Sequence, residues 1–160
     1  MLSLDATDRR ILELLQGDAS LAVADIAERI NLSQPPCWRR IKKLEEQGYI
    51  ERRVAMLNRR KLGLNVVVYT EVKLSANGRQ ALGDFEAKIR SFPEVTECYV
   101  MLGRSDFLLR IVTEDVESYE YFFRHHLSQL PGVQDITSSV ALSEVKYTTE
   151  LPIRDPGAPQ

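Results

Sequence analysis

The chain has 160 residues, of which 44% are hydrophobic and 28% are charged, and its formal net charge is −2. This composition is typical of a globular protein, and the length suits one domain or two small ones. No apolar run approaches the roughly 20 residues of a membrane span, and the N-terminus lacks the features of a signal peptide. The two cysteines, Cys37 and Cys98, are far apart and match no metal-binding spacing. We therefore expect a cytoplasmic protein with free thiols, without a metal, a cofactor or a membrane contact.

The charge is unevenly distributed along the sequence. Residues up to Lys61 carry a net charge of +3, and the rest of the chain carries −5. Within residues 34–61 the net charge reaches +6. A basic segment in an otherwise acidic protein indicates contact with a polyanion at one place. It also predicts two domains, residues 1–61 and 62–150, followed by a tail, 151–160, whose end is poorly ordered.

Three short helices are predicted in the first domain. Asp5 is suited to cap the first helix, because its carboxylate can accept from free backbone N–H groups. A second helix over residues 23–30 lacks such a residue at its start. The third helix follows a three-residue turn and spans residues 33–48. We expect Ser33 to be its N-cap, two prolines to lie in its first turn and Gly48 to end it.

The third helix combines an apolar stripe with a basic surface. Cys37, Ile41 and Leu44 recur at four and three residues and predict the buried side. Helix, tight turn and basic helix form the helix-turn-helix pattern, whose second helix enters the DNA major groove. The residues after Gly48 alternate loosely and predict a two-stranded wing with basic residues at its tip. The residues that we expect at DNA are Ser33, Gln34, Pro36, Trp38, Arg39, Arg40, Lys42, Lys43, Arg52 and Arg53.

Three residues of this helix need separate interpretation. Gln34 is best placed for a bidentate contact with a base, whereas the arginines and lysines also reach phosphates. Trp38 could contact the sugar–phosphate backbone, but we favour packing because large aromatic side chains are mostly structural. Cys37 lies on the apolar stripe, and we interpret it as a small core residue rather than a sensor thiol. The plain alternative for the whole basic run is a solvated charged face.

The second domain alternates strands and helices. Strands are predicted at residues 66–74, 95–102, 107–113 and 134–147, helices at 79–92 and 116–130, and a turn at 75–78. Pro-Glu-Val after the first helix is echoed by Pro-Gly-Val after the second, so the order is βαββαβ. This is the ferredoxin-like arrangement, an antiparallel sheet with both helices on one face. The predicted fold class is α+β, with an N-terminal winged helix-turn-helix and a C-terminal ferredoxin-like βαββαβ domain.

The second face of this sheet lacks a predicted cover. Residues 99–102 and 107–112 are largely apolar at odd and even positions, so both faces are predicted to be apolar. Helices can cover only one of them, and a large exposed apolar face is unfavourable in a monomer. The prediction is a homodimer, which suits a helix-turn-helix protein that reads a pseudo-palindromic site.

A short polar loop, Gly103-Arg104-Ser105-Asp106, joins two strands. Its glycine allows the backbone to approach a bound group closely, its N–H groups could bind a carboxylate, and Asp106 could bind an ammonium. Thr137 and Ser139 add hydroxyls on the last strand. A hairpin turn with polar side chains explains the loop equally well on spacing alone.

Several short motifs occur in a fixed order across both domains. They are Leu4-Asp5, Leu32-Ser33, Pro36-Cys37 with Arg39-Arg40-Ile41, Gly48-Tyr49-Ile50, Pro93-Glu94-Val95, Gly103 with Asp106-Phe107-Leu108, Leu130-Pro131-Gly132-Val133 and Lys146-Tyr147-Thr148-Thr149. Their order and spacing resemble the leucine-responsive regulator / asparagine regulator (Lrp/AsnC) family of prokaryotic transcription factors. The resemblance covers nearly everything from Leu4 to Pro152. Val23 departs from the capping residue that is usual in the family.

The resemblance implies a DNA-binding domain and a ligand-sensing and oligomerisation domain. It implies homodimers that assemble to octamers, bind double-stranded DNA at promoters and regulate amino-acid metabolism. It also implies a small amino-acid effector between dimers, at the loop that matches the family's Gly-x-x-Asp pattern. The implied effector-binding residues are Met101, Leu102, Gly103, Arg104, Ser105, Asp106, Thr137 and Ser139.

Two other functions fit the same architecture. Siroheme decarboxylases resemble this two-domain arrangement and use histidines around a tetrapyrrole. Here His125 and His126 are adjacent, so they point about 100° apart on a helix and make a poor paired acid site. We therefore expect no enzyme activity and no catalytic residue. An architectural DNA binder without an effector would keep the basic helix and leave Asp106 with a structural role.

Overall fold

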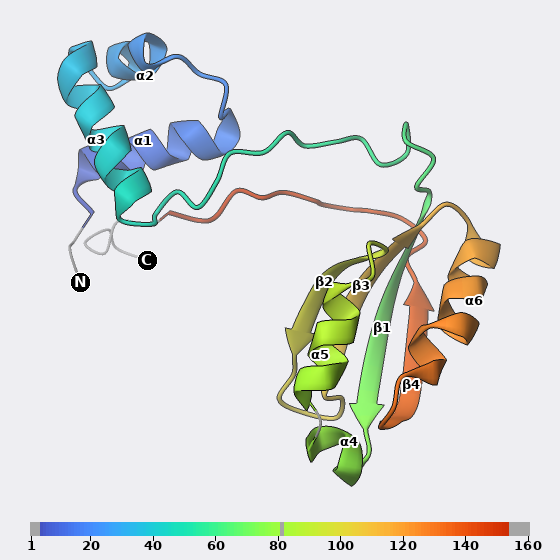
Figure 1. Ribbon diagram of the computed structural model, residues 1–160. Coiled ribbons are helices and arrows are strands. Elements are labelled where there is room, and N and C mark those ends of the chain that lie inside the picture. The colour runs from blue at the N-terminus through green and yellow to red at the C-terminus, as the bar shows by residue number, and fades with distance from the viewer. Residues whose placement is uncertain (1–3, 81, 154–160) are drawn as a thin grey trace. The chain divides into compact units, whose positions relative to one another are not determined.

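The structure is a computed structural model that describes residues 4–80 and 82–153. Among these, the residues of Met1–Met56 and Lys146–Gln160 form one compact unit, and Leu57–Val145 form the other. Each unit has its own hydrophobic core. Figure 1 labels the helices and strands of both units. No helix in the described part of the chain is long and apolar enough to cross a membrane. The prediction for the end of the tail concerns residues 154–160, which lie outside the described residues.

Three helices build the first unit: α1 (Ala6–Gly17), α2 (Val23–Arg29) and α3 (Gln34–Glu46). The predicted cap of α1 is confirmed, because the Asp8 N–H donates to Asp5 Oδ1 at 2.7 Å. As expected, α2 has no side-chain cap, since Ala22 occupies its N-cap position. The helices pack around a core of Ile11, Leu15, Ile26, Ala27, Cys37, Ile41 and Leu44. The predicted apolar stripe of α3 is therefore confirmed.

The first turn of α3 differs in one respect from the prediction. Ser33 occupies the N-cap position, but its hydroxyl accepts no hydrogen bond from the helix. An N-cap side chain accepts from the N–H of the second or third helical residue. In α3 these residues are Pro35 and Pro36, which have no N–H to donate. The expected side-chain cap was wrong for a reason that the sequence already contained.

Residues with positive φ shape both ends of α3. Asn31 (φ 56°) lies in the turn from α2, and Gly48 (φ 75°) follows the last helical turn. The Tyr49 N–H donates to Leu44 O at 3.0 Å, which closes the helix as a glycine C-cap does. The predicted stop at Gly48 is confirmed. The last turn of α3 is therefore closed by the backbone of the residues that follow it.

The chain leaves the first unit after α3 and later returns to it. The predicted two-stranded wing is not formed, since residues 51–58 carry no strand. Residues 141–150 carry no strand either, but the return segment then joins α1. Gln16 Nε2 donates to Leu151 O at 3.0 Å, and Gln16 Oε1 accepts from the Leu151 N–H at 2.9 Å. These two hydrogen bonds attach the return segment to α1 of the first unit.

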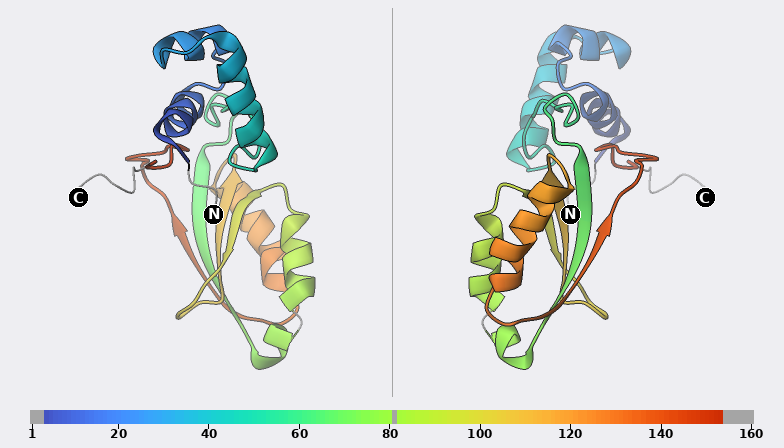
Figure 2. Two further views of the ribbon diagram at one scale, coloured as in Figure 1. Left: turned by 90° about the vertical axis from the view of Figure 1, so that its left-hand side faces the viewer. Right: turned by 90° about the vertical axis from the view of Figure 1, so that its right-hand side faces the viewer.

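The second unit is a four-stranded antiparallel sheet in the order β2-β3-β1-β4. Its elements are β1 (Val66–Leu74), α4 (Ala76–Gln80), α5 (Leu82–Arg90), β2 (Val95–Val100), β3 (Phe107–Thr113), α6 (Val116–His125), the 3-10 helix η1 (Leu127–Gln129) and β4 (Val133–Val140). Figure 2 shows α5 and α6 on the same side of the sheet. The predicted βαββαβ ferredoxin-like arrangement is confirmed. The core between sheet and helices includes Val68, Val72, Phe85, Ile89, Phe107, Leu109, Ile111 and Phe122.

Two element predictions in this unit were wrong. Residues 76–80 form α4 where a turn was predicted, and the Gly78 N–H donates to Ser75 Oγ at 3.1 Å as at a capped helix start. The last strand ends at Val140 rather than near residue 147. Val140 pairs with Val68, and the antiparallel partner strand β1 begins at Val66. Beyond this pair, β1 therefore offers only two more residues to β4. A strand cannot continue without a neighbour to receive its hydrogen bonds.

The sheet face opposite the helices is mixed in polarity. Alternation and register place Tyr69, Glu71, Tyr99, Leu108 and Arg110 together on this face. Its side chains form ion pairs as well as apolar contacts, with Arg110 Nε 3.8 Å from a Glu97 oxygen. The prediction that both faces are apolar was therefore too simple. The open face therefore carries charged groups beside aromatic rings.

Candidate functional site

The predicted DNA-binding residues lie on the side of α3 that faces away from the core. Burial of Cys37, Ile41 and Leu44 turns the remaining positions outward. Pro36 and Arg40 are partly buried, and the exposed ones are Ser33, Gln34, Trp38, Arg39, Lys42, Lys43, Arg52 and Arg53. The structure thus places most of the predicted set on one helix. Arg52 and Arg53 follow in the extended segment after it.

Trp38, which was predicted to pack, is only partly covered. Its side chain is 52% exposed and lies outside the core of the unit. The reason is its position, since the residue after Cys37 is rotated about 100° away from the buried stripe. An exposed indole on the basic surface of α3 is available for contact with a sugar or a base.

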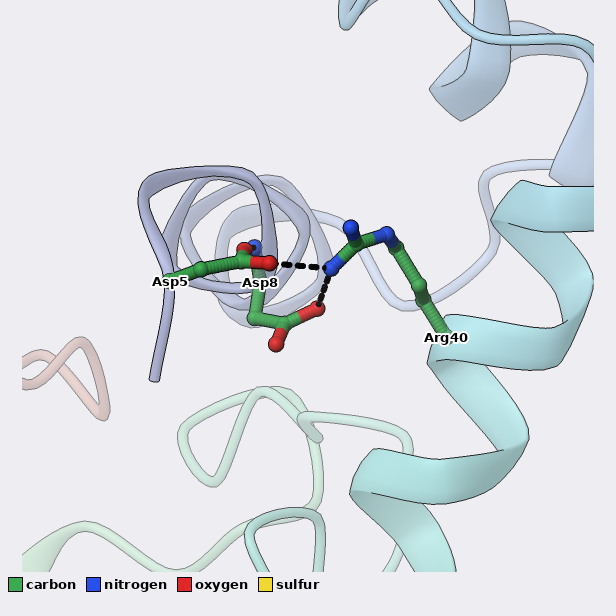
Figure 3. A network of polar contacts seen from close by, with 3 residues as sticks. All are labelled: Asp5, Asp8 and Arg40. Carbon is green, nitrogen blue, oxygen red and sulfur yellow. Dashed lines mark hydrogen bonds and ion pairs between the residues drawn. The ribbon is translucent and has the colours of Figure 1, made fainter. Parts of the chain in front are cut away.

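Arg40 is held by two carboxylates of α1. Its Nη1 donates to Asp8 Oδ1 at 2.7 Å and to Asp5 Oδ2 at 2.6 Å (Figure 3). Hydrogen bonds to Asp8 and Asp5 raise the pKa of the Arg40 guanidinium. Burial alone would raise the pKa of Asp5, but the Asp8 N–H and Arg40 together hold it below its ordinary value. This network fixes α3 against the start of α1, so Arg40 is a positioning residue of the surface.

The other basic residues differ in whether they form an ion pair with Glu45. Lys42 Nζ lies 2.9 Å and Arg53 Nη2 lies 3.1 Å from its carboxylate, and hydrogen bonding to Lys42 is the main cause of the lowered pKa of Glu45. By contrast, Arg39 and Lys43 form no ion pair with the described residues. Both line a hollow of about 430 Å³ beside the Arg40 network. On α3 itself, Arg39 and Lys43 are therefore the cations that need no exchange of partners to reach a phosphate.

The predicted effector loop is tied to the end of β1 by its aspartate. The Asp106 N–H donates to Val72 O at 2.9 Å, and Asp106 Oδ2 accepts from the Leu74 N–H at 2.7 Å. The Met101 N–H donates to Asp106 O at 2.9 Å. Gly103 has a φ of 153°, a conformation that side-chain-bearing residues rarely adopt. The Asp106 carboxylate therefore already has a structural partner in the backbone.

Arg104 extends from this loop over the open face of the sheet. Its Nη2 lies 3.0 Å from Glu71 Oε2. Glu71 is also the register partner of Thr137 on β4, so the loop and Thr137 come together. Ser139 lies two positions further along β4 and pairs with Tyr69. It is therefore not next to Glu71, the residue that Arg104 of the loop contacts. Met101, Leu102 and Arg104 are exposed, whereas Ser105 and Asp106 are partly buried.

The sequence analysis missed Glu71, Asp5 and Asp8 as parts of these surfaces. Glu71 is an isolated acid within an apolar strand, a signal that could have indicated a charged partner on the open face. Cys37 is fully buried, and burial raises the pKa of its thiol, which fits the predicted core role. No group of three or more metal-ligating side chains occurs among residues 4–80 and 82–153.

A helix-turn-helix with a basic second helix, joined to a ferredoxin-like unit with a polar loop, defines a DNA-binding regulator with an appended ligand-binding domain. Family comparison agrees: the description "Winged helix-turn-helix DNA-binding" matches residues 4–51, and "Lrp/AsnC ligand binding domain" matches residues 67–151. The chain belongs to the Lrp/AsnC family of transcriptional regulators. The resemblance and the fold class predicted from the sequence are confirmed, although residues 51–58 do not form the strands of a wing.

Relatives match over nearly the whole chain. The DNA-binding transcriptional activator DecR of Escherichia coli K12 is 37% identical over 150 residues, 94% of this chain and 99% of DecR. The proline dehydrogenase transcriptional activator of Rhodobacter capsulatus is 41% identical over 142 residues, 89% of this chain and 92% of that protein. The names describe regulators, so the expectation that the chain is not an enzyme is confirmed.

Two solved structures are similar across both units. An AsnC family transcriptional regulator from Agrobacterium tumefaciens is 42% identical, with a TM-score of 0.88 and coverage of 93% of this chain and 97% of its own. A transcriptional regulator of Neisseria meningitidis, solved as a complex with L-Met, is 36% identical. Its TM-score is 0.90, with coverage of 94% of this chain and 97% of its own.

Proposed function

We propose that this protein binds promoter DNA through α3 and regulates amino-acid metabolism in response to a small amino acid. The observation that carries the proposal is the placement of Arg39 and Lys43, exposed on a core-anchored helix and without an internal ion-pair partner among the described residues. Relatives support the biological role. One of them is the leucine-responsive regulatory protein of Salmonella typhimurium, which is 33% identical over 151 residues, 94% of this chain.

At DNA, each part of the α3 surface has its own role. Gln34 in the first turn reaches a base edge, since the N-terminal residues of a recognition helix lie deepest in the major groove. Arg39 and Lys43 contact phosphates or guanine, and Trp38 covers the backbone beside them. Ser33, Pro36, Lys42, Arg52 and Arg53 complete the contact set, with Lys42 and Arg53 exchanging Glu45 for phosphate.

The proposed function divides between two domains of the chain. Residues 1–61 act as the DNA-binding domain, and residues 62–150 act as the ligand-sensing and oligomerisation domain. The open sheet face joins two copies in a homodimer, because its exposed tyrosines, Tyr69 and Tyr99, are of a residue type that is enriched at interfaces. Dimers assemble further to an octamer. The protein works in the cytoplasm, where double-stranded DNA and reduced thiols are both present.

The effector lies at the loop of residues 101–106, close to Thr137 and with Ser139 at the far edge. Backbone N–H groups around Gly103 take the carboxylate of the amino acid, and Arg104 exchanges Glu71 for it or stays paired beside it. Ser105 adds a hydroxyl, and Met101 and Leu102 meet the side chain. The Asp106 carboxylate meets the ammonium while it keeps the hydrogen bond from the Leu74 N–H.

A thermal-shift screen of the common amino acids tests this proposal, because a ligand that binds the folded state raises the midpoint of unfolding. Asp106→Asn is the matched variant, since its amide oxygen can still accept from the Leu74 N–H while the charge is lost. We expect one or a few amino acids to stabilise the wild type, to shift its affinity for its own promoter fragment, and to have a much weaker effect on the variant.

A second candidate is an architectural DNA binder without an effector. The observation in its favour is the hydrogen bond from the Leu74 N–H to Asp106, which gives the loop aspartate a structural role without any ligand. Under this candidate no amino acid changes either the unfolding midpoint or the affinity for DNA. The same screen therefore separates the two functions.

A further inference from the structure

A cavity lies in the helical layer of the second unit, away from the loop of residues 101–106. It has a volume of about 290 Å³ and is lined by residues of α5, α6, η1 and the segments that follow them. This volume is at the lower end of the range for sites of drug-sized ligands, so the cavity suits a smaller molecule. It belongs entirely to one unit and needs no second copy of the chain.

The inner wall of this cavity is apolar and aromatic. Phe85 and Leu130 are 4% and 7% exposed, so they form a fixed base. Phe92 packs edge-on against Phe122 with ring centroids 5.2 Å apart. The His126 ring lies 5.3 Å from the Phe92 ring and also lines the cavity. Such a wall favours the apolar body of a ligand.

The rim of the cavity carries a cation with no ionic partner. Lys88 Nζ lies 5.8 Å from the centroid of the Phe92 ring, directly above the apolar wall. Within the described residues, Lys88 forms no ion pair. Asp84 lies one helical turn before it on α5 and also lines the cavity. A ligand that offers a carboxylate beside an apolar group would match the cation and the wall together.

We propose that this cavity binds a small monocarboxylate with an apolar body. The Lys88 ammonium takes the carboxylate, and Phe85, Phe92 and Leu130 enclose the body. Two classes of ligand share this chemistry. One is an α-amino acid, whose ammonium meets Asp84, and the other is a carboxylic acid without an ammonium. This site is separate from the effector loop, and its occupancy does not depend on the proposed effector.

The two histidines of the chain give a local readout, because both line the cavity and the sequence has no others. The imidazole NMR signals of the full-length protein are followed during titration with 4-methylpentanoate and with its neutral amide. We expect saturable shifts with the acid and affinity about 10- to 100-fold weaker with the amide, as for loss of a charged hydrogen bond. Lys88→Met should weaken binding of the acid by the same factor, and Lys88→Arg should restore it.

Arg90→Met is the matched control, because it removes one positive charge from α5 outside the cavity. It should bind the acid as the wild type does. Titration with L-leucine and the Asp84→Asn variant assigns the source, since only an amino acid should lose affinity in that variant. The proposal is overturned if the amide binds as tightly as the acid, if Lys88→Met binds as the wild type does, or if no histidine signal moves at about 10 mM acid. An Asp106→Asn variant that loses amino-acid sensing but keeps these shifts separates this site from the effector loop.

Discussion

The basic surface of α3 and the loop of residues 101–106 use charged side chains in opposite ways. On α3 the structural ion pair of Arg40 lies beside Arg39 and Lys43, which have no such partner among the described residues. In the loop, the same aspartate that we expect to meet a ligand also fixes the backbone. On α3, one residue positions the helix and its neighbours are left to contact DNA. In the loop of residues 101–106, Asp106 both positions the backbone and is expected to contact the ligand.

This difference determines how each surface must be tested. On α3, a residue that positions the helix and a residue that contacts DNA can be removed separately. In the loop, removal of the whole Asp106 side chain changes fold and binding together.

Asp106→Ala should destabilise the second unit, because it leaves the Leu74 N–H without its acceptor. The expected loss is about 1–3 kcal/mol in the free energy of unfolding. Asp106→Asn should lose less than about 1 kcal/mol, since the amide oxygen keeps the hydrogen bond. Urea unfolding of both variants measures the difference. Equal losses in the two variants would show that the charge of Asp106, and not its acceptor oxygen, stabilises the loop.

Arg40→Gln should lower the free energy of unfolding of the first unit by about 1 kcal/mol at neutral pH, a value limited by solvent screening of partly exposed pairs. The pKa of Asp5 is depressed in the folded state, so its stabilisation is present above its ordinary value of 3.8 and is lost as the pH falls through the lower folded pKa. Unfolding of wild type and variant between pH 7 and pH 2 should therefore converge at the acid end. Parallel curves over this range would contradict the ion-pair account.

The start of α2 offers a smaller effect in the stabilising direction. Ala22→Ser should add a side-chain cap and raise stability by about 0.5–1 kcal/mol. Ser33→Ala is its control at the start of α3 and should have almost no effect, because Pro35 and Pro36 offer no N–H to the Ser33 hydroxyl. Thermal unfolding measures both changes. A clear loss in Ser33→Ala would mean that the hydroxyl has a structural partner not described above.

Most of the fold followed from the sequence, because periodicity and turn residues report local structure. The strands Val66–Leu74 and Phe107–Thr113 have the predicted bounds, and Asp5 caps α1 as expected. The last strand was predicted too long, since its length depends on a partner strand far away in the chain. The missing wing has the same origin. Extended segments in the sequence do not reveal whether a neighbour receives their hydrogen bonds.

The candidate site was predicted less completely, for a related reason. The charge run of α3 identified the surface but not the ion pairs within it. Asp5 and Asp8 lie more than thirty residues before Arg40, and their contact follows from the packing of α1 on α3. Packing of Trp38 was predicted from residue type, whereas the half of its surface that stays exposed follows from its angle around the helix. Partners that are distant in sequence decide which charged side chains remain available.

The salt dependence of promoter binding tests the central claim most directly. The logarithm of the affinity is measured against the logarithm of salt concentration for the wild type, for Arg39→Ala with Lys43→Ala, and for Arg40→Gln. Each lost phosphate contact reduces the slope by about 1. We predict a slope smaller by about 2 for the double variant and a wild-type slope for Arg40→Gln. A wild-type slope in the double variant, with a reduced slope in Arg40→Gln, would contradict the assignment of contact and positioning residues on α3.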